Sequence, residues 1–220
     1  MAVVVNGAYM PPTPVNVAFG VLMGAALLGA AFDRRSVLVV ALAAALPDLD
    51  AVASLVVHGA TNAALHNAFV PAAAAALVYW DAERREESFL RARYGWRGVR
   101  VAWVAVAAFA VAGIGADLFN HEAVNLLYPV HDRFYAVFGR LLYSTQDGVV
   151  QTYVQFGGER LLQSPGTTAN YHVPTWVNPT PGTDNPAGVE RRLRLVESGW
   201  QAVVVAASAA VLAIRLREVR

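Results

Sequence analysis

The sequence predicts an all-α fold, a polytopic helical membrane bundle of about five transmembrane helices with additional interfacial helices. Hydrophobic residues make up 56% of the 220 positions, whereas a soluble globular domain has about 45–50%. They gather in Ala-, Val- and Leu-rich runs close to the ~17–25 residues that a membrane-crossing helix needs. The five predicted spans are residues 15–32, 36–57, 63–80, 99–119 and 200–216.

The chain divides into three predicted parts. Residues 1–140 form a membrane-embedded helical core, residues 141–199 form an extramembrane or interfacial segment, and residues 200–220 form a C-terminal transmembrane helix. The middle part contains five prolines between positions 164 and 188, which predict an irregular loop.

An interfacial helix is expected over residues 131–143. Phe134, Phe138 and Leu141 recur there at helical spacing, with arginines on the opposite face. This pattern is typical of a helix that lies in the plane of the membrane surface.

Arginine placement predicts the orientation of the bundle in the cell membrane. The loops after the first and third spans and the C-terminal tail are rich in arginine: Arg34, Arg35, Arg84, Arg85, Arg91, Arg93, Arg97, Arg100, Arg215, Arg217 and Arg220. With five spans these segments share one side of the membrane, which is expected to be cytoplasmic. Six further arginines lie in the long segment 120–199 on the other side, three of them (Arg191, Arg192 and Arg194) next to the last span, and long loops count little in this rule.

Composition also excludes several classes of function. The chain has no cysteine, so it has no disulfide, no thiolate nucleophile and no cysteine-ligated zinc. Its formal net charge is only +1, so no nucleic-acid partner is expected. The expected partners are membrane lipids.

The clearest candidate for chemistry is Pro47-Asp48-Leu49-Asp50, inside the second predicted span. Carboxylates within a membrane are costly and indicate function by default. Pro47 disfavours helical backbone at the preceding residue, and a local break would let Asp48 and Asp50 converge on one cation. The alternative is that the motif only caps a helix end.

Polar residues from four spans are predicted to meet in the outer half of the membrane. At ~1.5 Å per residue, Asp50 lies ~21 Å and Asp117 ~27 Å from the inner ends of their spans, in a core ~30 Å thick. His66 lies near the outer end of the third span and Asn16 at the outer start of the first. The site is therefore expected toward the non-cytoplasmic side.

Two further histidines are candidate ligands. His121 follows Asp117 by four residues and shares its helix face if that helix continues. His58 lies at the end of the second span. Each could instead be a solvated histidine at a helix end or in a loop. Carboxylates combined with imidazoles suit Zn²⁺, Mn²⁺ or Fe²⁺, so the predicted cofactor is one such divalent metal. The candidate ligands are Asp48, Asp50, His66, Asp117, His121 and His58.

Three motifs in order resemble the membrane-bound, metal-dependent hydrolase family, which includes an inner-membrane protein under LexA control. They are Pro47-Asp48-Leu49-Asp50, Leu65-His66-Asn67, and Asp117-Leu118-Phe119 followed by Leu126-Leu127-Tyr128-Pro129. The resemblance covers about residues 10–140 and implies a helical membrane protein with a divalent-metal site and hydrolase activity. The chain departs from the family pattern at three expected histidines, where it has Asn16, Thr61 and Gly113.

Two classes of function follow from the resemblance and its departures. In the first, a metal-activated water hydrolyses a lipid-linked or phosphoester substrate, with Asp50 or Asp117 as the base. In the second, the protein is a non-catalytic membrane scaffold that keeps the family fold with a degraded site. A small transporter is less favoured, because the sequence has no paired broken helices in two matching halves.

Overall fold

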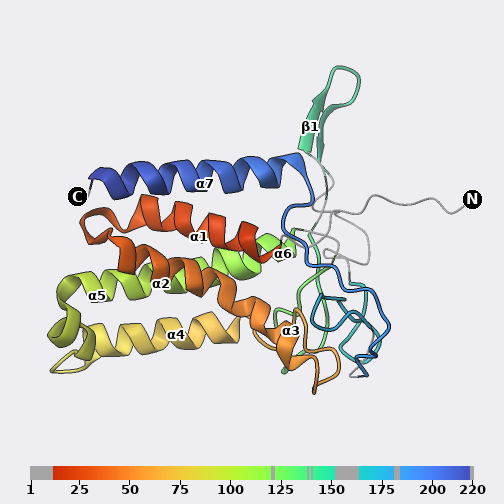
Figure 1. Ribbon diagram of the computed structural model, residues 1–220, viewed down its shortest axis with the longest axis horizontal. Coiled ribbons are helices and arrows are strands. Elements are labelled where there is room, and N and C mark those ends of the chain that lie inside the picture. Colours follow the sequence, from red (N-terminus) through yellow and green to blue (C-terminus); the bar gives the residue numbers. More distant parts are fainter. Residues whose placement is uncertain are drawn as a thin grey trace, which may run out of the picture.

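The computed structural model describes residues 12–119, 122–137, 139, 141–151, 164–180 and 184–218. In these residues, five longer helices lie side by side as one bundle (Figure 1). They are α1 (Thr13–Leu27), α2 (Arg34–Ala45), α4 (Phe69–Tyr79), α5 (Phe89–Ala108) and α7 (Gly199–Glu218). The shorter elements are η1 (Gly29–Ala31), η2 (Leu46–Leu49), α3 (Asp50–Ala53), η3 (Trp80–Arg84), η4 (Phe109–Gly115), α6 (Ala116–Leu118) and the hairpin strands β1 (Leu141–Ser144) and β2 (Gly148–Gln151).

The helical membrane-protein class is confirmed. Three continuous helical stretches in the described residues are long and apolar enough to cross a membrane: Arg34–Ala53, Phe89–Leu118 and Gly199–Glu218. They correspond to the second, fourth and fifth predicted spans. Helix α1 is shorter, with 15 residues, and is also apolar.

The third predicted span is only partly helical. Residues 54–68 form turns, and α4 begins at Phe69 rather than near residue 63. The Asn67 side-chain oxygen accepts hydrogen bonds from the N–H groups of Phe69 and Val70 at 3.0 and 3.1 Å. These bonds satisfy donors that the first turn of a helix leaves without partners, so Asn67 fixes where α4 starts.

Small residues hold the first two helices close together. A Cβ atom at Gly20 of α1 would lie only 2.7 Å from the Cβ of Ala44 in α2. Close backbone approach at glycine and alanine is a common way to pack helices in membranes. The core between these helices and α5 is fully apolar and includes the buried side chains Val21, Leu28, Val40, Val104 and Ala108.

The predicted interfacial helix over residues 131–143 is wrong in the residues described there, while Phe138 lies outside them. Tyr135 pairs with Val124 in an isolated β-bridge, and Phe134 is fully buried with its N–H bonded to the carbonyl of Gly166. Residues from Leu141 onward form the antiparallel β1–β2 hairpin. Long-range pairing therefore overrides the local helical spacing of the apolar residues.

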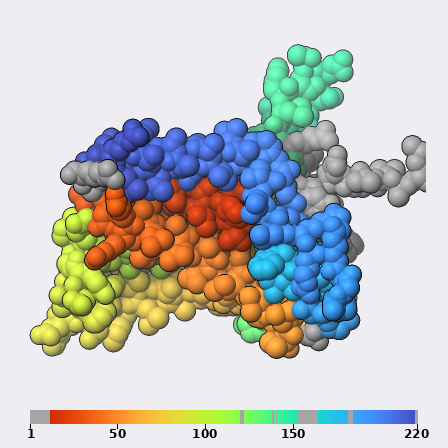
Figure 2. All heavy atoms as spheres, in the orientation of Figure 1, coloured from red at the N-terminus to blue at the C-terminus, as the bar shows by residue number. Residues whose placement is uncertain are grey.

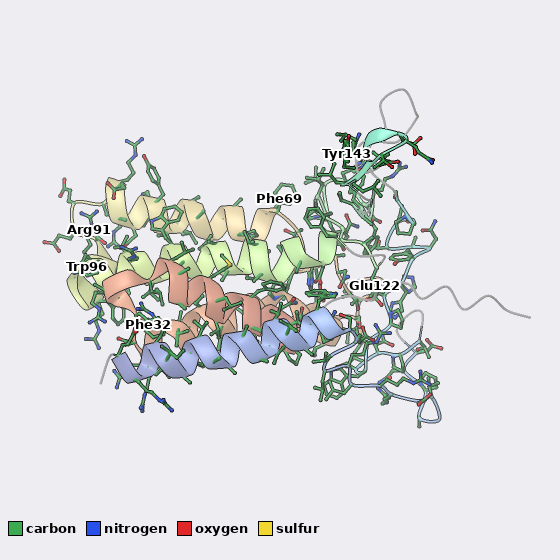
Figure 3. The ribbon with its side chains drawn as sticks, turned by 90° about the horizontal axis from the view of Figure 1, so that it is seen from above. Phe32, Phe69, Arg91, Trp96, Glu122 and Tyr143 are labelled. Atoms are coloured by element: carbon green, nitrogen blue, oxygen red, sulfur yellow. The ribbon has the colours of Figure 1, made fainter. Side chains whose placement is uncertain are left out.

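The two ends of the bundle differ in charge. The α1–α2 turn, the α4–α5 turn and the C-terminal end of α7 lie at one end, where Phe32, Arg91 and Trp96 are labelled, whereas Glu122 and Tyr143 lie at the other (Figures 1 and 3). The three arginine-rich segments thus share one end, as predicted. Residues 164–180 and 184–198 have no helix or strand, and Figure 2 shows them packed over the opposite end.

Candidate metal centre

The acidic motif lies where α2 ends. The helix tightens at Leu46 into the 3₁₀ turn η2, which contains Pro47 and Asp48, and α3 then starts at Asp50. Leu46 keeps α-helical backbone angles, but Pro47 has no N–H to donate to the carbonyl four residues earlier, which accounts for the change of helix type. The irregular turn directs both carboxylates toward His66.

His66 is fully buried at the centre of three carboxylates. Its Nδ1 atom lies 2.7 Å from Oδ2 of Asp50. Its Nε2 atom lies 2.9 Å from Oδ2 of Asp117 and 3.6 Å from Oδ1 of Asp48. Asp117 reaches this point from α6, which follows the π-helical turn η4. The structure thus brings together side chains that lie up to 69 positions apart in the sequence.

The hydrogen bond at Nδ1 of His66 determines whether Nε2 can bind a metal. When Nδ1 carries the proton that it donates to Asp50, Nε2 of the neutral ring is a lone-pair donor to a metal or an acceptor. In this tautomer Nε2 faces two carboxylates, which are also acceptors, so no hydrogen bond joins them. A cation placed among these atoms would remove the conflict.

Several other buried polar atoms of the cluster also lack hydrogen-bond partners. Of the thirteen such atoms in the described residues, seven belong to this cluster and to Asn16 and Thr61 beside it: Asn16 Oδ1, Asp48 Oδ2, Asp50 Oδ1, Thr61 Oγ1, His66 Nε2, Asp117 Oδ1 and Asp117 Oδ2. Native proteins leave few buried polar atoms unpartnered, so this concentration of them fits a site that could hold a cation. One ligand atom each from Asp48, His66 and Asp117 lies within 4.8 Å of the other two, which fits a single metal ion.

Asp50 stands behind the histidine rather than within this group of three. A carboxylate that accepts the second ring N–H of a metal-ligating histidine fixes the tautomer and the orientation of the ring. Asp50 is predicted from the sequence as a ligand, whereas its geometry indicates that Oδ2 orients the His66 ring.

Two of the three positions where the family resemblance expects histidine lie at the site. Asn16 is fully buried, and its Nδ2 donates to Oδ1 of Asp48 at 3.3 Å. Thr61 is 1% exposed and lines the same cavity as Asp48 and Asp50. Both residues offer oxygen atoms where the resemblance leads one to expect imidazole nitrogens.

The third such position, Gly113, serves helix packing. A Cβ atom there would lie 2.6 Å from Cγ of Pro47 and 2.9 Å from the carbonyl oxygen of Ala44. A side chain at this position would push the Pro47 turn away from η4. Glycine therefore keeps the turn that carries Asp48 close to the helix that carries Asp117.

The two additional histidines do not join the described cluster. His58 is exposed, in the turns that follow α3. The helix that carries Asp117 ends at Leu118, and His121 lies outside the described residues, so its role as a ligand stays a prediction.

The residues that hold the loops over the site are not predicted from the sequence. Asn178, from the proline-rich segment, is fully buried and donates through Nδ2 to the carbonyl oxygen of Ser54 at 3.0 Å. Asp132 accepts hydrogen bonds from the Thr168 hydroxyl at 2.6 Å and from the Asn125 amide at 2.7 Å. Burial raises the pKa of Asp132, but the bonds from Thr168 and Asn125 outweigh this effect and lower it overall. Such contacts join distant positions and leave no local signal in the sequence.

A cavity of about 830 Å³ opens beside the cluster. Asp48, Asp50 and Thr61 line one side of it, and residues of α1, α7 and the proline-rich segment line the rest. Two members of the cluster, Asp48 and Asp50, therefore border a space of the size that small ligands occupy, whereas His66 and Asp117 do not line it.

A family model described as the YdjM inner membrane protein matches residues 10–179. The chain belongs to this family. The match to YdjM includes all four residues of the carboxylate–histidine cluster and ends before α7. It confirms the inner-membrane family indicated by the motifs, and metal-dependent hydrolysis remains a prediction. Comparison with curated proteins and with solved structures gives no match.

Proposed function

We propose that this protein is a membrane-bound hydrolase that uses a divalent cation held by Asp48, His66 and Asp117. The observation that carries the proposal is the buried cluster of polar atoms without hydrogen-bond partners. Each such atom costs about 1–3 kcal/mol when it stays unpartnered. A cation among carboxylates and an imidazole would satisfy these atoms together, and Zn²⁺, Mn²⁺ and Fe²⁺ suit such a mixed donor set.

A bound divalent cation would supply an activated water and polarise the ester or phosphoester bond to be cleaved. In this proposal Asp50 has two roles, one for each oxygen. Its Oδ2 holds His66 in the ligating orientation at 2.7 Å. Its Oδ1 has no hydrogen-bond partner, and Asp50 lines the cavity, so this oxygen is placed to accept a proton there. Asp117 is not among the residues that line the cavity, so it acts as a ligand rather than as the base.

In this proposal the protein crosses the membrane several times, and α1 and α4 span it beside the three longer helical stretches. The arginine-rich end would lie in the cytoplasm, following the distribution of basic residues in membrane proteins. The metal site would then open on the non-cytoplasmic side. A lipid-linked ester or phosphoester in the outer leaflet is the class of substrate that fits this position.

A non-catalytic scaffold is the second candidate, and the residues at the three expected histidine positions favour it. Asn16 and Thr61 are weaker metal ligands than imidazole, and Gly113 contributes only to packing against Pro47. In this case Asp48 and Asp50 serve the helix ends, and no cation binds.

The experiment that separates the two candidates is a hydrolysis screen with detergent-purified protein loaded with Zn²⁺, Mn²⁺ or Fe²⁺. The substrates are phospholipids, lipid-linked phosphates and simple phosphoesters, and the Asp117→Asn variant is assayed beside the parent. Asp81→Asn is the matched control, because it alters a buried carboxylate at the opposite end of the bundle. Hydrolysis by the parent and the control, but not by Asp117→Asn, supports the enzyme. No hydrolysis with any cation contradicts it.

A further inference from the structure

The apolar part of the cavity is not explained by metal binding. From α1 it is lined by Val17, Ala18 and Val21, and from α7 by Val205, Ala209 and Leu212. Figure 1 shows α7 lying along α1 for most of its length. The total volume of about 830 Å³ falls within the range of ~300–1,000 Å³ that is usual for ligand sites.

The residues of α7 that line the cavity form one stripe on that helix. Positions 205, 209 and 212 are separated by four and three residues and so share a face that extends ~10 Å along the axis. Helix α7 is long and apolar enough to cross a membrane. The stripe therefore faces the cavity at a depth where the surrounding solvent is lipid hydrocarbon.

The other end of the cavity is polar. Asp48, Asp50 and Thr61 line it, and each has a buried oxygen without a hydrogen-bond partner. Two ion pairs also line the cavity: Arg192 contacts Glu190 at 2.7 Å, and Arg194 contacts Glu122 at 2.9 Å. The cavity thus has an apolar end between two helices and a polar end at the carboxylates. These two ends match the apolar chain and the polar head of an amphiphile.

We propose that this cavity binds one hydrocarbon chain of a membrane amphiphile between α1 and α7, with the polar head of the amphiphile at Asp48, Asp50 and Thr61. The inference rests on the proposed function in one respect, namely that the bound amphiphile is the substrate. A small water-soluble phosphoester would occupy only the polar end and would leave the apolar stripe without a role. Since the family match ends at residue 179, the α7 wall of this groove is a feature of this chain beyond the matched region.

Photo-crosslinking of the full chain in detergent tests the groove. The probe is a phosphatidic acid with a diazirine at the end of one acyl chain, and labelled peptides are identified by mass spectrometry. We expect labelling of residues 17–21 and 205–212 that saturates as the probe concentration rises. A second phosphatidic acid, with the diazirine beside the glycerol, should instead label the polar end, at Pro174, Thr175 and Trp176.

Two alanines on α7 give a matched pair of variants. Both are exposed, but Ala209 lines the cavity and Ala206 is not among the lining residues. Ala209→Trp should lose most of the saturable labelling, and Ala206→Trp should keep it. Val205→Trp is a second groove variant, used if Ala209→Trp does not elute as a monodisperse species.

The outcomes separate this inference from the proposed function, because metal content is measured on the same samples. Labelling that does not saturate, or that is equal in Ala209→Trp and Ala206→Trp, would overturn the groove even if the parent binds a metal. Saturable labelling lost only in the groove variants would support it even if no metal is found.

Discussion

The two ends of the bundle contain buried carboxylates with opposite hydrogen-bonding. At the arginine-rich end, Asp81 has both oxygens fully used. Oδ1 accepts from Phe89 N–H at 2.9 Å and Oδ2 from Ser88 Oγ at 2.8 Å. At the other end, Asp48, Asp50 and Asp117 surround a single histidine and leave four oxygens without partners.

This difference separates a structural carboxylate from a candidate ligand. Asp81 caps the start of α5, since it accepts the N–H groups of Phe89 and Leu90 in the first turn. Burial and charge do not distinguish it from the cluster, because Asp81 is also buried. What distinguishes it is that the protein itself supplies every hydrogen-bond partner of Asp81, whereas at the other end it leaves carboxylate oxygens without one.

The largest expected effect comes from removing the only imidazole of the cluster. His66→Ala should lower metal affinity by more than ~100-fold, beyond the 10–100-fold that is usual for outer-shell changes. Isothermal titration with Mn²⁺ or Zn²⁺ measures it. His58→Ala is the control, because His58 is exposed and outside the cluster. Equal affinities of the two variants would show that His66 is not a ligand.

Asp50→Asn should have a smaller effect on the same titration. The amide keeps the shape of the side chain but holds the His66 ring less firmly, so affinity should fall by roughly 10–100-fold. A loss as large as that of His66→Ala would instead make Asp50 a direct ligand.

Gly113→Ala tests whether that position serves packing. The added Cβ would meet Pro47 Cγ at 2.6 Å, and overpacking of this kind costs about 1–3 kcal/mol. Gly115→Ala is a control in the same π-helical turn, where a Cβ meets only the Ala110 carbonyl oxygen at 3.4 Å. Thermal unfolding in detergent compares them. A Gly113 variant as stable as the Gly115 variant would contradict the packing role.

The smallest effect concerns the pH dependence of the Asp81 cap, which lies just beyond α4 and outside the predicted span. The Leu90 N–H, the Ser88 hydroxyl and the other donors outweigh burial and lower the pKa of Asp81 to about 2. The cap therefore stabilises the fold above the unfolded-state pKa of 3.8, and this contribution is lost as pH falls from 3.8 to about 2. The difference in Tm between the parent and Asp81→Asn should shrink over this range. A difference that stays constant down to pH 2 would show that the charge of Asp81 does not matter.

Much of the acidic end could be anticipated from the sequence. Hydropathy predicts the long helices, because each apolar run has the length that a bilayer imposes. Pro47 predicts the change of backbone beside Asp48, since proline acts through local geometry. The similar depth of Asp50, His66 and Asp117 in three predicted spans anticipates their meeting, although His66 lies in the turns before α4.

The remaining features depend on contacts between distant residues. Helix α4 starts late because Asn67 caps it, while the preceding turns are held by bonds such as that from Asn62 Nδ2 to the Ala123 carbonyl oxygen at 3.0 Å. The packing of Gly113 against Pro47 is likewise invisible in spacing. Residues 131–137 and the hairpin follow partners that no local period indicates.

The most direct test of the central claim is the metal content of detergent-purified protein, measured by elemental analysis for the parent and for Asp48→Asn. A cation among Asp48, His66 and Asp117 predicts close to one equivalent of Zn, Mn or Fe in the parent and little in the variant. Absence of metal from the parent after loading with each cation, or equal metal in both proteins, would contradict the claim.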